Sequence, residues 1–136
     1  MSDKIFFDTN VLVYCYTATE PNKKSVAVDL AQSPDAWVST QVLQELSNTL
    51  RKKFGKDWAE ITLTVDEVCQ NFEVFTNQPD TLRDAIRISD RYGYSLYDSL
   101  ILSSSIAIGC KIVYSEDMQN GQVIDGSLTI VNPFLP

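Results

Sequence analysis

Apolar residues along the chain occur in two kinds of pattern. Short apolar runs bounded by polar residues are typical of strands, and they lie at residues 4–7, 36–38, 72–75, 111–114 and 128–131. Between these runs, apolar residues recur at intervals of three and four, which is the spacing of one face of a helix. The clearest case is the series Val42, Leu43, Leu46 and Leu50. The pattern predicts strands that alternate with helices.

Capping and breaking residues mark where the predicted helices begin and end. Pro21 suits the first turn of a helix, and Asp57 with Glu60 forms a capping-box pattern. Gly93 is a typical helix stop, and Asp125-Gly126 predicts a turn before the last strand. We expect helices over about residues 11–16, 21–32, 40–53, 57–70, 79–92 and 96–108.

The alternation of strands and helices predicts the fold class. Strands separated by helices imply a parallel sheet with helices on both faces. We therefore expect an α/β protein, a three-layer α/β/α sandwich with a mainly parallel central sheet of about five strands. A chain of 136 residues is long enough for one such domain, and we expect it to span residues 1–136. Sites in these sheets lie beyond the carboxyl ends of the strands, where the strand order reverses.

The amino-acid composition excludes several kinds of catalytic and metal-binding site. The chain has no histidine, which excludes histidine general bases, Ser-His-Asp triads and His-ligated zinc. Three widely separated cysteines predict reduced, packed thiols in a cytoplasmic protein. The apolar stretch over residues 96–114 is interrupted by serines, Gly109 and Lys111, so we expect no membrane span. The first residues are too polar for a signal peptide.

Four carboxylates stand at the polar ends of apolar elements. Asp8 follows the run at residues 5–7, Asp117 comes shortly after the run at residues 112–114, and Glu45 and Asp98 lie near the starts of apolar helical segments. Acidic groups at the ends of buried elements are costly unless a cation meets them. Oxygen donors without imidazole favour Mg²⁺ or Mn²⁺. The four acids are therefore candidate metal ligands.

Each acid also has an ordinary structural interpretation. Asp8 fits an Asx-turn or helix N-cap, Glu45 fits an exposed helical glutamate, and Asp98 fits a capping box with Ser95. Asp117 fits a turn residue. The hypothesis of a site depends on all four occurring at compatible places.

These segments resemble those of PIN-domain nucleases. The resemblance lies in residues 5–12, 42–46, 97–101 and 114–117, and it extends over nearly the whole chain. The compact length and the ending Asn132-Pro133-Phe134 resemble the VapC-type toxins of bacterial toxin–antitoxin pairs.

The resemblance implies a function and a site. It implies a cytoplasmic, Mg²⁺-dependent endoribonuclease, with Mn²⁺ as an alternative ion, that leaves 5′-phosphate and 3′-hydroxyl ends. Its partners would be an RNA substrate, a cognate antitoxin and a second copy in a homodimer. The implied catalytic and metal-binding set is Asp8, Glu45, Asp98 and Asp117. The implied supporting residues are Thr9 or Asn10, which would orient Asp8, and Ser115.

The resemblance is incomplete after the last acid. Gln119 and Asn120 stand where some relatives have a further acid, so the number of ions, one or two, stays open. Glu116 lies next to Asp117, and because side chains alternate at a strand end, we expect it to point away.

Basic and aromatic residues have weaker signals. Candidate RNA-binding residues are Arg51, Lys52, Lys53 and Lys56. Cations in the last turn of a helix also favour the helix dipole, so solvated surface is the alternative. The net charge of −7 argues against binding of nucleic acid by bulk electrostatics. We expect Lys23 and Lys24 to face solvent, and Trp37 and Trp58 to lie in the core or an interface.

Rival functions differ in the residues that they require. An aspartyl-phosphate phosphatase requires a second aspartate where this chain has Asn10. A receiver domain requires a phosphoacceptor aspartate at the end of the third strand, where the chain has Thr76-Asn77. A degenerate PIN-like domain that binds RNA or protein without catalysis is the third alternative.

Overall fold

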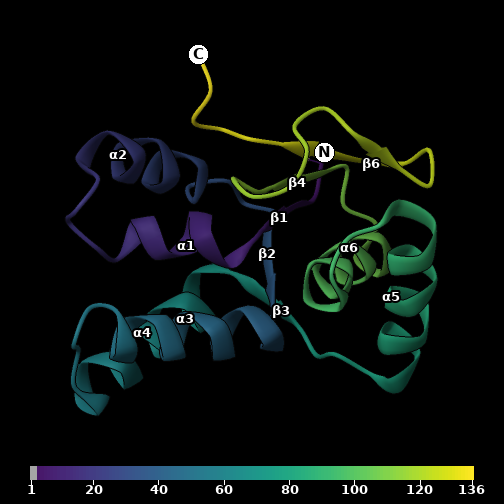
Figure 1. Ribbon diagram of the computed structural model, residues 1–136. Helices are drawn as coiled ribbons and strands as arrows, with labels where there is room; N and C mark the ends of the chain where they lie inside the picture. Colours follow the sequence, from purple (N-terminus) through teal and green to yellow (C-terminus); the bar gives the residue numbers. More distant parts are fainter. Residues whose placement is uncertain (1–2) are drawn as a thin grey trace.

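The computed structural model describes residues 3–136 (Figure 1). The strands are β1 (Ile5–Phe7), β2 (Ala36–Ser39), β3 (Glu73–Phe75), β4 (Ile112–Tyr114), β5 (Val123–Ile124) and β6 (Leu128–Val131). The helices are α1 (Thr9–Cys15), α2 (Pro21–Leu30), α3 (Thr40–Lys52), α4 (Trp58–Asn71), α5 (Pro79–Tyr92) and α6 (Leu96–Ile108). The predicted alternation of strands and helices is confirmed.

The six strands form one sheet in the order β3-β2-β1-β4-β6-β5. From β1 the chain builds outward through β2 and β3, and then crosses back to place β4 on the other side of β1. The strand order therefore reverses between β1 and β4, where Phe7 is in register with Tyr114. All pairings are parallel except the last, between β5 and β6. A ligand site is expected beyond this reversal point.

Helices cover both faces of the sheet, which confirms the three-layer α/β/α architecture. In Figure 1, α1 to α4 lie on one side of the strands, and α5 and α6 lie on the other. The core fills the space between the layers. Phe6 and Phe7 of β1 are fully buried, and the Phe7 ring meets the rings of Phe72 and Tyr114 edge to face.

Local signals set most of the element boundaries. The predicted capping box is present, with the Asp57 side chain accepting from the Glu60 backbone N–H at 2.8 Å. Gly93 ends α5 in the left-handed conformation at φ 80°. The first helix differs from the prediction, because it begins at Thr9 and not at Val11. Asp8 is its N-cap, so the strand β1 leads directly into α1 through this one residue.

Two further expectations need correction. The sheet has six strands and not about five, because it includes the short strand β5. Two residues are too few to give a periodic pattern in the sequence. Of the three cysteines expected to be packed, Cys69 is exposed on α4. Burial raises the pKa of Cys15 to about 11, which keeps that thiol protonated. Within residues 3–136, no helix combines the length and the apolar character that crossing a bilayer requires.

Candidate active site

Asp8 lies at the joint between β1 and α1, at the carboxyl end of the central strand. Its carboxylate is buried, with 6% of the residue exposed. Oδ1 accepts the Thr9 backbone N–H at 2.7 Å, and Oδ2 accepts the Ser115 hydroxyl at 2.9 Å. Ser115 directly follows β4, so the pairing of β1 with β4 brings this hydroxyl to Asp8.

The environment of Asp8 disfavours its charge. Burial raises the pKa of this carboxyl to about 7, although the hydrogen bonds from Ser115 and Thr9 lower it in part. The negative charges of Asp98 and Glu45 raise it further. A cation that approached Asp8 would therefore stabilise the ionised form of its carboxyl group.

Glu45 approaches the same point from α3. It lies half-buried in the second turn of that helix, and its Oε1 accepts the Thr9 hydroxyl at 2.6 Å. One turn earlier, the amide Nε2 of Gln41 donates to the carbonyl oxygen of Tyr97 at 3.1 Å. This bond ties α3 to the start of α6, where Asp98 lies. Gln41 Oε1 is buried and has no hydrogen-bond partner within residues 3–136.

Asp98 and Asp117 complete the set of acids. Asp98 lies in the first turn of α6, where its backbone N–H donates to the N-cap hydroxyl of Ser95 at 3.1 Å. Burial raises the pKa of the Asp98 carboxyl, and the charge of Asp117 raises it further. Asp117 is exposed in the segment after β4, where its Oδ2 accepts the Asn10 side-chain amide.

The four predicted acids therefore lie around one edge of the sheet, at the reversal point between β1 and β4. We call Asp8, Glu45, Asp98 and Asp117 the acid cluster. Within residues 3–136 none of them forms an ion pair with lysine or arginine. Their hydrogen-bond donors are neutral. The negative charge of the cluster is uncompensated, which is costly in a partly buried place.

The supporting residues contact more of the acids than expected. Thr9 or Asn10 was expected to orient Asp8, and the backbone N–H of Thr9 does donate to Asp8. The side chains of Thr9 and Asn10 donate to Glu45 and Asp117. Side chains at successive helical positions project about 100° apart, so the first turn of α1 can serve three acids at once.

The donor set fits a divalent cation in its chemistry. All available ligands are carboxylate, amide or hydroxyl oxygens, which suit Mg²⁺ or Mn²⁺. In the side-chain arrangement of residues 3–136, however, no three Asp, Glu or Cys residues are grouped closely enough to hold one ion together. Holding an ion with three of these acids therefore requires side-chain rotation.

The candidate RNA-binding residues lie beyond the acid cluster, at the end of α3 and in the turn that follows. Arg51, Lys52 and Lys53 are exposed. Trp58 was expected in the core or an interface, but it is 60% exposed and its ring lies 4.8 Å from the Arg51 guanidinium carbon. Lys53 lines a cavity of about 280 Å³ that reaches Asn10, so it is the basic residue that connects this surface to the site.

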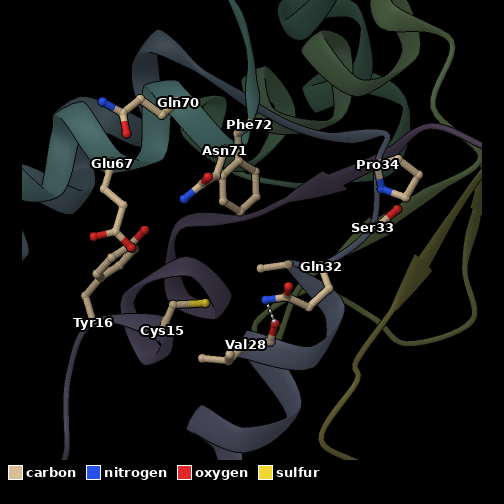
Figure 2. A pocket seen from close by; sticks show the side chains of 11 residues that line it. Cys15, Tyr16, Val28, Gln32, Ser33, Pro34, Glu67, Gln70, Asn71 and Phe72 are labelled. Atoms are coloured by element: carbon tan, nitrogen blue, oxygen red, sulfur yellow. Dashed lines mark hydrogen bonds between the residues drawn. The ribbon is translucent and has the colours of Figure 1, made fainter.

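A larger cavity of about 430 Å³ lies between α1, α2 and α4 (Figure 2). Its lining includes Cys15 and Tyr16 from the end of α1 and Glu67 from α4, and in Figure 2 the Tyr16 hydroxyl and the Glu67 carboxylate face each other. No member of the acid cluster lines it. This cavity is therefore separate from the candidate site.

A comparison with protein-family models decides the family. The model described as "PIN domain" matches residues 5–120 and includes every member of the acid cluster. The chain belongs to the PIN-domain family. A comparison with curated protein sequences gives no significant match.

Solved structures of toxin–antitoxin proteins share the PIN fold of this chain. VapC20 of Mycobacterium tuberculosis, described as a toxin that cleaves the sarcin–ricin loop, is 20% identical with a TM-score of 0.70, and the match covers 84% of this chain and 90% of that one. A toxin–antitoxin complex from Klebsiella pneumoniae is 16% identical with a TM-score of 0.72, covering 96% and 98%. VapBC2 of Rickettsia felis, bound to a promoter DNA fragment, is 17% identical with a TM-score of 0.66, covering 93% and 97%.

Proposed function

We propose that this PIN-domain protein is a divalent-metal-dependent endoribonuclease and the toxin of a toxin–antitoxin pair. The observation that carries the proposal is the uncompensated acid cluster at the reversal point of the sheet. The structural likeness to VapC20 supports RNA as the substrate, because that protein is described as a toxin that cleaves the sarcin–ricin loop. A bound Mg²⁺ or Mn²⁺ would supply a more acidic water and would neutralise charge on the scissile phosphate.

The residues of the chain contribute position and charge. Thr9 N–H and Ser115 hold both oxygens of Asp8, while the Thr9 hydroxyl holds one oxygen of Glu45. An ionised carboxylate has about four lone-pair sites, so these oxygens keep acceptor capacity for an ion or a water. Asp98, from α6, and Asp117, from the segment after β4, complete the cluster. Water would attack phosphorus while the bond from phosphorus to the 3′ oxygen breaks, and a proton would pass to that leaving oxygen. The products would then carry a 5′-phosphate and a 3′-hydroxyl, and the step needs no histidine.

Cleavage of RNA by the purified protein tests this function. We expect cutting in Mg²⁺ that stops in EDTA, with sequenced fragments that carry 5′-phosphate ends. Asp98→Asn should abolish cutting without unfolding the protein, because it removes one charge from a mutually repelling set. Asp66→Asn changes an exposed acid on α4 and is the matched control. Wild-type cutting by Asp98→Asn would contradict the assignment of the site.

The antitoxin is the proposed protein partner. An acidic cluster without internal cations attracts an arginine from a partner, because a guanidinium can bridge carboxylates bidentately. The net charge of −7 would speed the encounter with a basic peptide and make it salt-dependent. Expression of the chain alone should slow growth, and co-expression of a small reading frame encoded beside it should restore growth. If Asp8→Asn is as toxic as the wild type, the toxin proposal fails.

A non-catalytic PIN-like module and an aspartate-based phosphatase remain as alternatives. The presence of all four acids, with neutral donors on three of them, favours catalysis over a degenerate site. The phosphatase requires an acid at position 10, and this structure has Asn10 there, bound to Asp117. Absence of RNA cleavage with retained RNA binding would favour the non-catalytic module.

A further inference from the structure

Glu116 lies between Ser115 and Asp117 but takes no part in the acid cluster. Its Oε1 accepts the Tyr14 hydroxyl of α1 at 2.6 Å, and its Oε2 lies 2.5 Å from Nζ of Lys23 on α2. The expectation that Glu116 points away from Asp117 agrees with these contacts. The expectation that Lys23 faces solvent is wrong, because its side chain is partly buried in this ion pair.

Asn10 and Tyr14 lie on one face of α1, and their side chains donate hydrogen bonds to two consecutive acids. Residues four positions apart lie above each other on a helix. Asn10 donates to Asp117, and Tyr14 donates to Glu116. Since Asp8 is the N-cap of the same helix, α1 sets the position of the segment after β4 relative to Asp8.

Several interactions together restrain the Glu116 side chain and its partners. Lys23 also lies over the rings of Tyr14, at 5.2 Å, and Phe134, at 5.6 Å. Those two rings pack edge to face with centroids 5.2 Å apart. An isolated exposed ion pair contributes little, but here a charge-assisted hydrogen bond, an ion pair and aromatic packing share the same groups. The network joins α1, α2, the segment after β4 and the C-terminal segment.

The segment after Asp117 is held from its other side by Tyr94. The Tyr94 hydroxyl donates to Gln122 Oε1 at 2.5 Å and accepts the Gln119 backbone N–H at 3.1 Å. Tyr94 lies in the loop that leads to α6, which carries Asp98. Asp117 itself is exposed and has one side-chain hydrogen bond, from Asn10. The position of the Asp117 carboxylate therefore depends on the contacts of the neighbouring residues in this segment.

We propose that Tyr14 and Lys23 are positioning residues that hold the Glu116 carboxylate and thereby fix Asp117 at the edge of the acid cluster. Lys23 also neutralises the Glu116 charge, so that this acid serves as an anchor. The inference rests on the proposed nuclease function for its catalytic readout. It requires no contact of Tyr14 or Lys23 with RNA.

Tyr14→Phe tests the inference by removing one hydroxyl. We expect kcat for RNA cleavage to fall about tenfold to hundredfold, because misplacement of a catalytic group by about 1 Å has an effect of this size. KM should change less than twofold. In a second readout, without RNA, the Mn²⁺ concentration for half-maximal thermal stabilisation should rise. Tyr16→Phe, at the C-cap of the same helix and outside the network, is the matched control and should keep wild-type values.

Variants of Glu116 and Lys23 separate positioning from other roles. Glu116→Gln keeps an acceptor for Tyr14 and should retain more kcat than Glu116→Ala. Lys23→Met should lower kcat and leave KM unchanged. If Lys23→Met raises KM alone, Lys23 contacts RNA and the inference is wrong. It is also wrong if Tyr14→Phe matches Tyr16→Phe in both readouts. If the wild type does not cleave RNA, the proposed function fails, and the Mn²⁺ readout alone decides the inference.

Discussion

Asp8 combines deep burial with a negative charge that no lysine or arginine of residues 3–136 neutralises. Its pKa in the folded protein is about 7, compared with an ordinary value of 3.8. The folded form therefore holds the proton more tightly than the unfolded chain. As the pH rises from about 4 to about 7, the contribution of Asp8 to the free energy of unfolding falls, and above about pH 7 it falls no further.

Asp8→Asn should remove this pH-dependent loss. At pH 8 in EDTA we expect the variant to be more stable than the wild type by up to a few kcal/mol, since one pKa unit corresponds to about 1.4 kcal/mol. The difference should shrink toward pH 4. Urea unfolding at several pH values measures it, and Asp66→Asn should leave the wild-type curve in place. A variant less stable than the wild type at pH 8 would show that the hydrogen bonds of Asp8 outweigh its burial.

The last turn of α3 and the turn after it carry the basic surface that we propose for RNA. Lys53 alone among its predicted residues lines the cavity that reaches Asn10. In an Asp98→Asn background, which should bind without cutting, Lys53→Ala should weaken RNA binding and lower its salt slope by about 1. Lys111→Ala is the control, because Lys111 directly precedes β4 and so lies at the end of the sheet away from the acid cluster. Equal effects of the two substitutions would reject this path for RNA.

The ends of helices and strands were predictable from the sequence where they depend on residues close together in the chain. The capping residues Asp57 and Gly93 act within one turn, and the acids at the strand ends followed from the rule for parallel sheets. The partners of Thr9 and Asn10 were not predictable, because adjacent side chains on a helix reach different elements. The pairing of Lys23 with Glu116 joins residues 93 positions apart. It depends on the packing of α2 on α1 and on the pairing of β4 with β1.

An exposed apolar surface on α5 and α6 suggests how two copies would meet. Ile86 is 55% exposed and Tyr97 is 66% exposed, and Leu82 and Leu96 accompany them. Large apolar side chains exposed on neighbouring helices are candidates for burial between two copies. We expect the wild type to sediment as a dimer at tens of micromolar. Ile86→Lys should sediment as a monomer, whereas Leu63→Lys, a similar change on α4, should not. A wild-type monomer would reject the proposed homodimer.

Across the whole molecule, we propose that the acid cluster binds a divalent cation at the reversal point of the sheet once its side chains rotate toward the ion. Thermal unfolding of the purified protein against Mg²⁺ or Mn²⁺ concentration tests it most directly. An ion that binds only the folded form should stabilise it by roughly 3–4 kcal/mol at about 100 to 1,000 times its Kd. We predict that shift for the wild type and for Asp66→Asn, and its loss in Asp98→Asn. Melting temperatures that do not respond to either ion, or that respond equally in Asp98→Asn, would contradict the account.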